Sequence, residues 1–252
     1  MTFQNPGGLQ GEQGQTQPLG ASRWAGTNAA PLPQVDAATR ASFLTQSFFW
    51  MFAGLLLTAA IAAFAQFNEA FVSFGARYFI LLIIGQLVLA IGIQAGIRRI
   101  SASVALALFF VYAASLGVSI GVIVALAYPL ESVAAAFFSA GAMFGGAALY
   151  GYTTKRSLAT IGGYAYMAVF GLFVALIVNV FLGSGPIGYV ISIIGVLIFT
   201  VLTAWDVQRI SSGQLVAALG SVEKAAVIGA LHLYLDFVNL FLFLLRLFGG
   251  RR

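Results

Sequence analysis

Hydrophobic residues form seven long runs along this chain, and polar residues gather in the short segments between the runs. Each run is close to the roughly 20 apolar residues that a membrane-spanning helix needs. None shows the alternation of apolar and polar positions that is typical of a membrane β-strand. The pattern therefore predicts seven transmembrane helices, at residues 47–67, 78–97, 103–127, 132–152, 160–182, 186–207 and 225–247.

The composition agrees with a lipid environment. Of the 252 residues 61% are hydrophobic and only 8% are charged, whereas about a quarter of the residues of a soluble domain are charged. The net charge of +5 is spread thinly, in basic runs no longer than two residues, so it does not indicate nucleic-acid binding. With no cysteine and one histidine, the chain has no disulfide and little means of building a zinc site.

The first 42 residues differ from the rest of the chain. They are rich in Gln, Gly, Pro and Ala and contain no long apolar run. Such a segment buries too little apolar surface to offset the entropy of ordering, so we predict a disordered tail over 1–42 and a membrane domain over 43–252.

Basic residues in the connections predict the orientation, because loops that carry Lys and Arg stay in the cytoplasm. The tail and the second, fourth and sixth connections carry two basic residues each, while the other connections carry one or none. We therefore predict a cytoplasmic N-terminus. The basic residues Arg246, Arg251 and Arg252 conflict with an external C-terminus, so the last run either crosses fully, which we favour, or re-enters on the same side.

Small residues spaced four apart predict close contacts between helices, because they let two backbones approach. Three such pairs of glycines lie within the predicted spans: Gly92 and Gly96, Gly117 and Gly121, and Gly141 and Gly145.

The last apolar run carries polar side chains that are costly in lipid. His232, Asp236 and Asn239 are spaced four and three residues apart, so they share one face of a helix. A charge at the bilayer centre costs at least about 2.5–3.5 kcal/mol, so this face is expected to turn toward protein or water. Two interpretations remain open: a hydrogen-bonded contact between helices, and a functional carboxylate.

A second acid, Asp206, lies about 20 residues into the sixth run, or ~30 Å along a helix, which is the predicted cytoplasmic end. It is placed either to pair locally with Arg209 or to approach Asp236 on the next helix. Two adjacent carboxylates cannot easily both ionise in a medium of low dielectric constant, so such a pair would hold a proton. Doubly ionised, it would offer oxygen ligands to Ca²⁺. Arg98 and Arg99 end the second run on the same side and are candidates for a breakable latch on Asp206, or for simple membrane anchors.

Four stretches resemble the Bax inhibitor-1 family of transmembrane proteins, and its bacterial members in particular. They are MFAGLLLTA (51–59), GAMFGGAALYGYTTKRSLATIGGY (141–164), AWDVQRI (204–210) and LHLYLDFVNLFLFLLRLFG (231–249).

This resemblance implies a seven-helix bundle with a central last helix. It also implies a pH-sensitive Ca²⁺ leak governed by paired aspartates, which match Asp206 and Asp236, with a latch arginine near Arg98 or Arg99. Neutral Gln86 stands where some bacterial relatives have an acid, and Trp205 replaces the usual tyrosine before the first aspartate.

Two rival functions remain. Paired aspartates on consecutive helices also occur in intramembrane aspartyl proteases, but these carry Gly-x-Gly-Asp, and here Leu233, Tyr234 and Leu235 precede Asp236. The other rival is a non-conducting regulator that binds a membrane protease or another membrane protein, which the neutral Gln86 favours.

We therefore predict an all-α, multi-pass protein of the bacterial cytoplasmic membrane that is not an enzyme and conducts Ca²⁺ or another cation under control of pH. Asp206 and Asp236 would bind the ion or proton, with His232, Asn239, Gln86 and Arg209 as supporting polar residues. The expected partners are the lipid bilayer and a membrane protein, without nucleic acid. Ca²⁺ would be a transported ion, and no other cofactor is expected.

Overall fold

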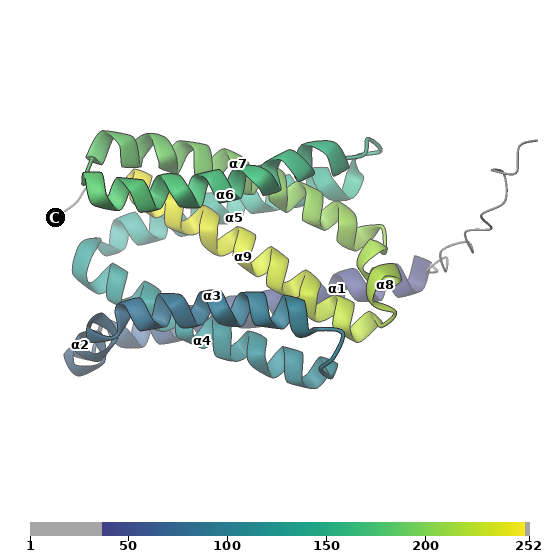
Figure 1. Ribbon diagram of the computed structural model, residues 1–252, viewed down its shortest axis with the longest axis horizontal. Helices are drawn as coiled ribbons and strands as arrows, with labels where there is room; N and C mark the ends of the chain where they lie inside the picture. Colours follow the sequence, from purple (N-terminus) through teal and green to yellow (C-terminus); the bar gives the residue numbers. More distant parts are fainter. Residues whose placement is uncertain (1–36, 250–252) are drawn as a thin grey trace, which may run out of the picture. The chain divides into compact units, whose positions relative to one another are not determined.

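The structure is a computed structural model that describes residues 37–249, and within this range every regular element is a helix (Figure 1). Seven helices are long and apolar enough to cross a membrane, and two short ones lie between them. The helices are α1 (Ala37–Ala65), α2 (Glu69–Arg77), α3 (Phe79–Gly96), α4 (Ala102–Ala127), α5 (Leu130–Thr153), α6 (Ala159–Leu182), α7 (Gly185–Ser211), α8 (Gln214–Leu219) and α9 (Val222–Phe248). The predicted all-α membrane fold with seven spans is confirmed.

The boundaries of the first helix differ from the prediction. Most of the tail predicted over 1–42 lies outside the described residues, but its last six residues belong to α1, which begins at Ala37. Ala is the best helix former, and the Ala-rich segment AATRAS extends the helix beyond the apolar run that marks the membrane.

Polar residues set several helix ends. Ser101, Ser184 and Ser221 each cap a helix N-terminus by accepting a hydrogen bond from a backbone N–H three residues later. The short helix α8 lies between Gly213 and Gly220, whose positive φ angles of 76° and 67° suit glycine. Asn68 caps α2, the other short helix, by accepting a hydrogen bond from Phe71 N.

The last helix is the most buried element of the membrane domain. In the most apolar 18-residue stretch of α9, 78% of the residues are buried, against 56% or fewer in the other six spans. It packs against α1, α4, α5, α7 and α8, and in Figure 1 its yellow ribbon runs between α5–α7 and α1–α4. The expected central position of the last helix is thus observed.

Only one of the three glycine pairs makes the predicted contact. A Cβ atom at Gly117 would lie 2.8 Å from Ile61 Cβ, and one at Gly121 would lie 2.7 Å from Ala65 Cβ, so α4 packs closely on α1. The other two pairs were predicted wrongly for contacts within the chain: a Cβ at Gly92, Gly96, Gly141 or Gly145 would meet nothing within 4 Å.

Candidate functional site

Asp206 lies near the C-terminal end of α7 and is only 8% exposed. Arg209, one turn further along, donates to Asp206 Oδ1 at 3.1 Å, which is the local pair that the spacing allowed. The guanidinium of Arg209 also lies 4.7 Å from the ring centre of Trp205. A Cβ at Gly162 would collide with the Trp205 ring, so α6 and α7 hold this indole, and with it Arg209, in place.

Asp236 lies in the middle of α9 and is 4% exposed. Its Oδ2 atom has no hydrogen-bond partner among the described residues. The neighbouring hydroxyl of Thr203, on α7, donates to Phe199 O at 2.8 Å and also interacts with the Asp236 carboxyl group. A buried carboxylate oxygen without a partner is costly when ionised, so this environment favours a bound proton or an incoming cation.

The structure brings the two acids together across the contact between α7 and α9. The carboxyl groups of Asp206 and Asp236 interact electrostatically. His232, one turn before Asp236, places Nδ1 3.6 Å from Asp206 Oδ1. The two acids and the histidine therefore form one titratable cluster drawn from two helices.

The hydrogen bonds of His232 define where its protons lie. Gln94, on α3, donates from Nε2 to Ala90 O, so its Oε1 faces His232 Nε2 at 3.2 Å and accepts from it. Neutral His232 then directs the lone pair of Nδ1 toward Asp206, and Nδ1 has no hydrogen-bond partner among the described residues. Two acceptor atoms, His232 Nδ1 and Asp206 Oδ1, therefore face each other at this contact.

The charge of the cluster follows from these contacts. With both acids ionised and His232 neutral, the guanidinium of Arg209 offsets one of two negative charges, and one remains. One added proton makes the cluster neutral. A single protonation event therefore decides whether this buried region is charged.

The structure does not bring the candidate latch arginines to Asp206. Arg98 and Arg99 are exposed after the end of α3, and Arg98 donates from Nη2 to the carbonyl of Ala218 at 3.3 Å. Lys224 donates to the backbone carbonyl of Arg98, so this end of α3 is tied to α8 and α9. The latch stays a prediction for another conformation.

Two of the predicted supporting residues satisfy their side chains elsewhere. Asn239 donates to Leu235 O within its own helix, at 2.8 Å. Gln86 is buried and donates to Ser119 Oγ at 2.8 Å, linking α3 to α4. Neither hydrogen bond involves the aspartates.

Two carboxylates alone are a sparse set of ligands for Ca²⁺, which takes six to eight oxygens. Among residues 37–249 there is no group of three or more His, Cys, Asp or Glu side chains that is arranged to hold a metal ion. Asp206 and Asp236, the predicted Ca²⁺ ligands, therefore suit brief contact with a partly hydrated ion better than a resident metal.

Two residues of this region were not singled out from the sequence: Gln94 and Thr203. Gln94 and Thr203 are polar residues within apolar runs, which was the available signal. Gln208 accepts from Leu158 N at 2.8 Å and donates to Arg156 O at 2.9 Å, so it fixes the α5–α6 connection beside Asp206. Gln208 belongs to the Asp-x-Gln of the AWDVQRI stretch, one of the four that carry the family resemblance.

Comparison with known proteins gives consistent matches. The family model described as "Inhibitor of apoptosis-promoting Bax1" matches residues 40–252. The inner membrane protein YbhL of Escherichia coli (strain K12) is 41% identical over 217 residues, which are 84% of this chain and 92% of that protein. A Deinococcus radiodurans protein is 38% identical over 211 residues, covering 83% of this chain and 91% of its own. The protein YrjE of Lactococcus lactis is 38% identical over 214 residues, covering 82% and 90%.

Proposed function

This chain belongs to the Bax inhibitor family of integral membrane proteins, and we propose that it provides a leak path for Ca²⁺ or similar cations that opens when a buried proton is lost. One observation carries the proposal: two buried aspartates on adjacent helices, Asp206 and Asp236, interact with each other, and within the described part of the chain a single arginine, Arg209, pairs with them.

The physical argument starts from the cost of charge in a membrane. A lone charge at the bilayer centre costs at least about 2.5–3.5 kcal/mol, so the neutral, singly protonated cluster stabilises the closed arrangement of α7 and α9. Loss of the proton leaves one net negative charge, which water or a cation can offset only if the helices admit them. Raising the pH therefore opens the path and lowering it closes the path.

The distribution of basic residues supports a location in the bacterial cytoplasmic membrane with the N-terminus inside. The relative from Escherichia coli is named as an inner membrane protein. In this orientation Asp206 lies near the cytoplasmic end of α7, so the proton would exchange with the cytoplasm. Arg98 or Arg99 would act as a latch only if α3 moves toward α7 during gating.

Purified full-length protein in liposomes that contain a Ca²⁺-sensitive dye tests this proposal. We expect faster Ca²⁺ entry at about pH 8 than at about pH 6, because deprotonation charges the cluster. Asp206→Asn and Asp236→Asn should each remove the difference between the two pH values. Glu223→Gln is the matched control, since it removes an exposed carboxylate from the same helix, α9. An unchanged pH dependence in both asparagine variants would refute gating by this pair.

The same preparation separates the rival functions. Cleavage of a membrane-embedded peptide that is lost in both Asp→Asn variants would favour an aspartyl protease. Absence of flux at every pH, together with a membrane protein that co-purifies in fixed ratio, would favour a non-conducting regulator.

A further inference from the structure

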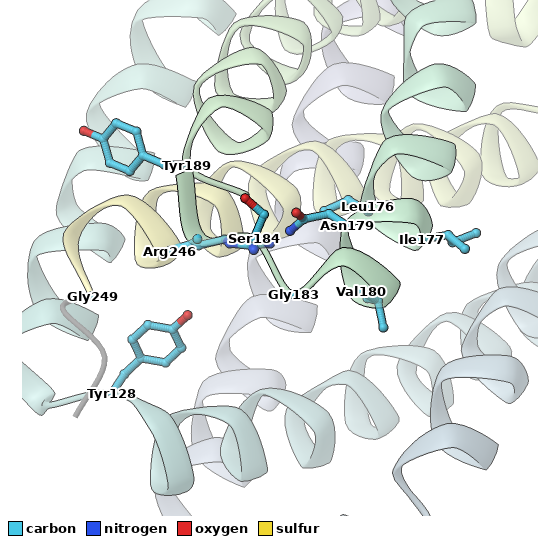
Figure 2. Close-up of a pocket in the computed structure, with 11 residues that line it drawn as sticks. Tyr128, Leu176, Ile177, Asn179, Val180, Gly183, Ser184, Tyr189, Arg246 and Gly249 are labelled. Carbon is cyan, nitrogen blue, oxygen red and sulfur yellow. The ribbon is translucent and has the colours of Figure 1, made fainter. Parts of the chain in front are cut away.

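A second polar region lies at the opposite end of α7 from Asp206, around the α6–α7 connection and the C-terminal end of α9 (Figure 2). It is a cavity of about 610 Å³, within the usual size range of small-molecule sites. The lining side chains include Arg246, Asn179, Ser184 and Tyr128. Arg246 is ten residues beyond Asp236, or ~15 Å along the helix, so this cavity is separate from the aspartate cluster.

No acid among residues 37–249 forms an ion pair with Arg246. The ion pairs among the described residues both involve Asp206, and Arg246 takes part in neither. The C-terminal ends of α6 and α9 and the N-terminal end of α7 together contribute about half a negative charge, which leaves a net positive charge of about half a unit. The cavity is therefore suited to an anion.

The guanidinium of Arg246 is held in position rather than free. A Cβ at Gly188 would collide with Arg246 Nη2, so the guanidinium lies directly on the backbone of α7. With the Asn179 amide oriented to satisfy both of its groups, Arg246 Nη2 donates to Asn179 Oδ1 at 3.2 Å and Asn179 Nδ2 donates to Ser184 O at 3.0 Å. Arg has five N–H donors, so most remain available to a ligand.

Polar groups from α6, from α9 and from the α4–α5 and α6–α7 connections converge on the same space. Figure 2 shows Arg246, Asn179 and Ser184 side by side and the hydroxyl of Tyr128 directed toward them, while Tyr189 points away. A Cβ at Gly249 would collide with the Tyr128 ring, so the end of α9 fixes this ring as well. Hydroxyl, amide and guanidinium donors around one cavity match the acceptor oxygens of a phosphate group.

The apolar part of the lining indicates what carries the phosphate. Leu176, Ile177 and Val180 line the cavity from α6, and Ile177 and Val180 are 60% and 78% exposed on the surface of a membrane-spanning helix. In a bilayer this surface faces acyl chains. We propose that the Arg246 cavity binds the head group of an anionic phospholipid, with the phosphate on Arg246 and an acyl chain along α6.

Titration of the purified full-length protein in detergent with phosphatidylglycerol, followed by native mass spectrometry, tests this site. We expect phosphatidylglycerol to bind more tightly than phosphatidylcholine, whose own cation competes with Arg246. Arg246→Gln should weaken phosphatidylglycerol binding about tenfold or more, the usual effect of losing a charge-assisted hydrogen bond. The affinity of Arg246→Lys for phosphatidylglycerol should lie between those of the native protein and Arg246→Gln, because lysine keeps the charge but loses the fork of donors.

Two further variants make the result specific. Gly188→Ala should weaken binding by displacing the guanidinium, even though Arg246 is retained. Arg156→Gln is the matched control, because it removes an exposed arginine from the α5–α6 connection; the hydrogen bonds of Arg156 to Thr154 and Gln208 use its own backbone N and O and are kept in this variant. Helix content by circular dichroism verifies that each variant is folded, and if Arg246→Gln or Gly188→Ala is not folded, Arg246→Lys carries the comparison with the native protein.

Inorganic phosphate distinguishes a lipid from a soluble anion. If the lipid is the ligand, millimolar phosphate should neither bind detectably nor displace phosphatidylglycerol. Displacement by phosphate, equal binding of the two lipids, or unaltered binding in Arg246→Gln would each overturn the proposal. None of these outcomes depends on ion flux.

Discussion

The hydroxyl group of Tyr234 gives a sharp test of how the central helix is held. Tyr234 is fully buried on α9, and its OH lies 2.6 Å from Thr58 Oγ1 on α1. Thr58 Oγ1 also lies 2.9 Å from Ala113 O on α4 and 3.0 Å from Gly54 O. Because Thr58 has one hydrogen to donate and a carbonyl waiting to accept it, the tyrosine donates to the threonine. This short chain of hydrogen bonds, from Tyr234 through Thr58 to Ala113 O, joins α9, α1 and α4.

Removing the hydroxyl of Tyr234 and removing the hydroxyl of Thr58 are expected to cost different amounts of stability. Tyr234→Phe removes the donor, while Thr58 keeps its carbonyl partner, so the loss should be about 0.6–1 kcal/mol. The aromatic contacts with Phe109 and Tyr112, at 5.4 and 6.0 Å between ring centres, are available to phenylalanine as well. Thr58→Val leaves the tyrosine hydroxyl buried without its partner, which should cost about 1–3 kcal/mol.

The double variant Thr58→Val/Tyr234→Phe gives the decisive comparison of unfolding free energies. With both polar groups removed, nothing is left unsatisfied, so the double variant should be more stable than Thr58→Val alone. Unfolding in mixed micelles of rising dodecyl sulfate content, followed by far-UV circular dichroism, gives the free energies. Tyr164→Phe, which alters a 65% exposed tyrosine, should change the free energy of unfolding by less than about 0.5 kcal/mol.

Additive losses in the double variant would refute this reasoning. They would mean that the two hydroxyls contribute independently and that no bond joins α1 to α9 at this level. Confirmation would have a functional consequence. Tyr234 and Asp236 are two residues apart and so lie about 200° apart around α9. The hydroxyl chain would then hold one side of α9 while the other side carries the acid that faces α7.

Two further predictions concern the contacts around the aspartates. Gly151→Ala should destabilise the fold by about 1–3 kcal/mol, because its Cβ would collide with the Ala204 carbonyl on α7. Gly145→Ala, on the same helix, is the control: its Cβ meets nothing within 4 Å, so it should not destabilise the fold. Equal losses of stability for the two variants in the micelle assay would contradict the packing argument. Arg98→Gln should cost less than about 0.5 kcal/mol, since Arg98 is exposed. If the latch forms during gating, this variant should also raise Ca²⁺ flux at acidic pH, and unchanged flux at acidic and alkaline pH would remove Arg98 from the mechanism.

The aspartate site was partly predictable from the chain alone. Asp206 and Asp236 are conspicuous because acids are rare in apolar runs, and helical spacing places His232 on the same face as Asp236. The sequence left open whether Asp206 pairs locally with Arg209 or approaches Asp236, because spacing along the chain does not say which side of α7 faces α9. Gln94 was missed because its interaction with His232 joins residues 138 positions apart.

The sequence by itself determined the number of candidate membrane spans, their approximate ends and the positions of the acids along them. Each of these follows from transferring one segment from water to hydrocarbon, which depends on that segment alone. Only the tertiary structure decided that Gly117 and Gly121 contact a neighbouring helix while Gly92 and Gly141 do not. It also decided that Arg246 faces a cavity whose described lining contains no acid. The reason is that acyl chains and protein interiors are about equally apolar, so hydrophobicity does not distinguish the side of a helix that faces lipid from the side that faces another helix.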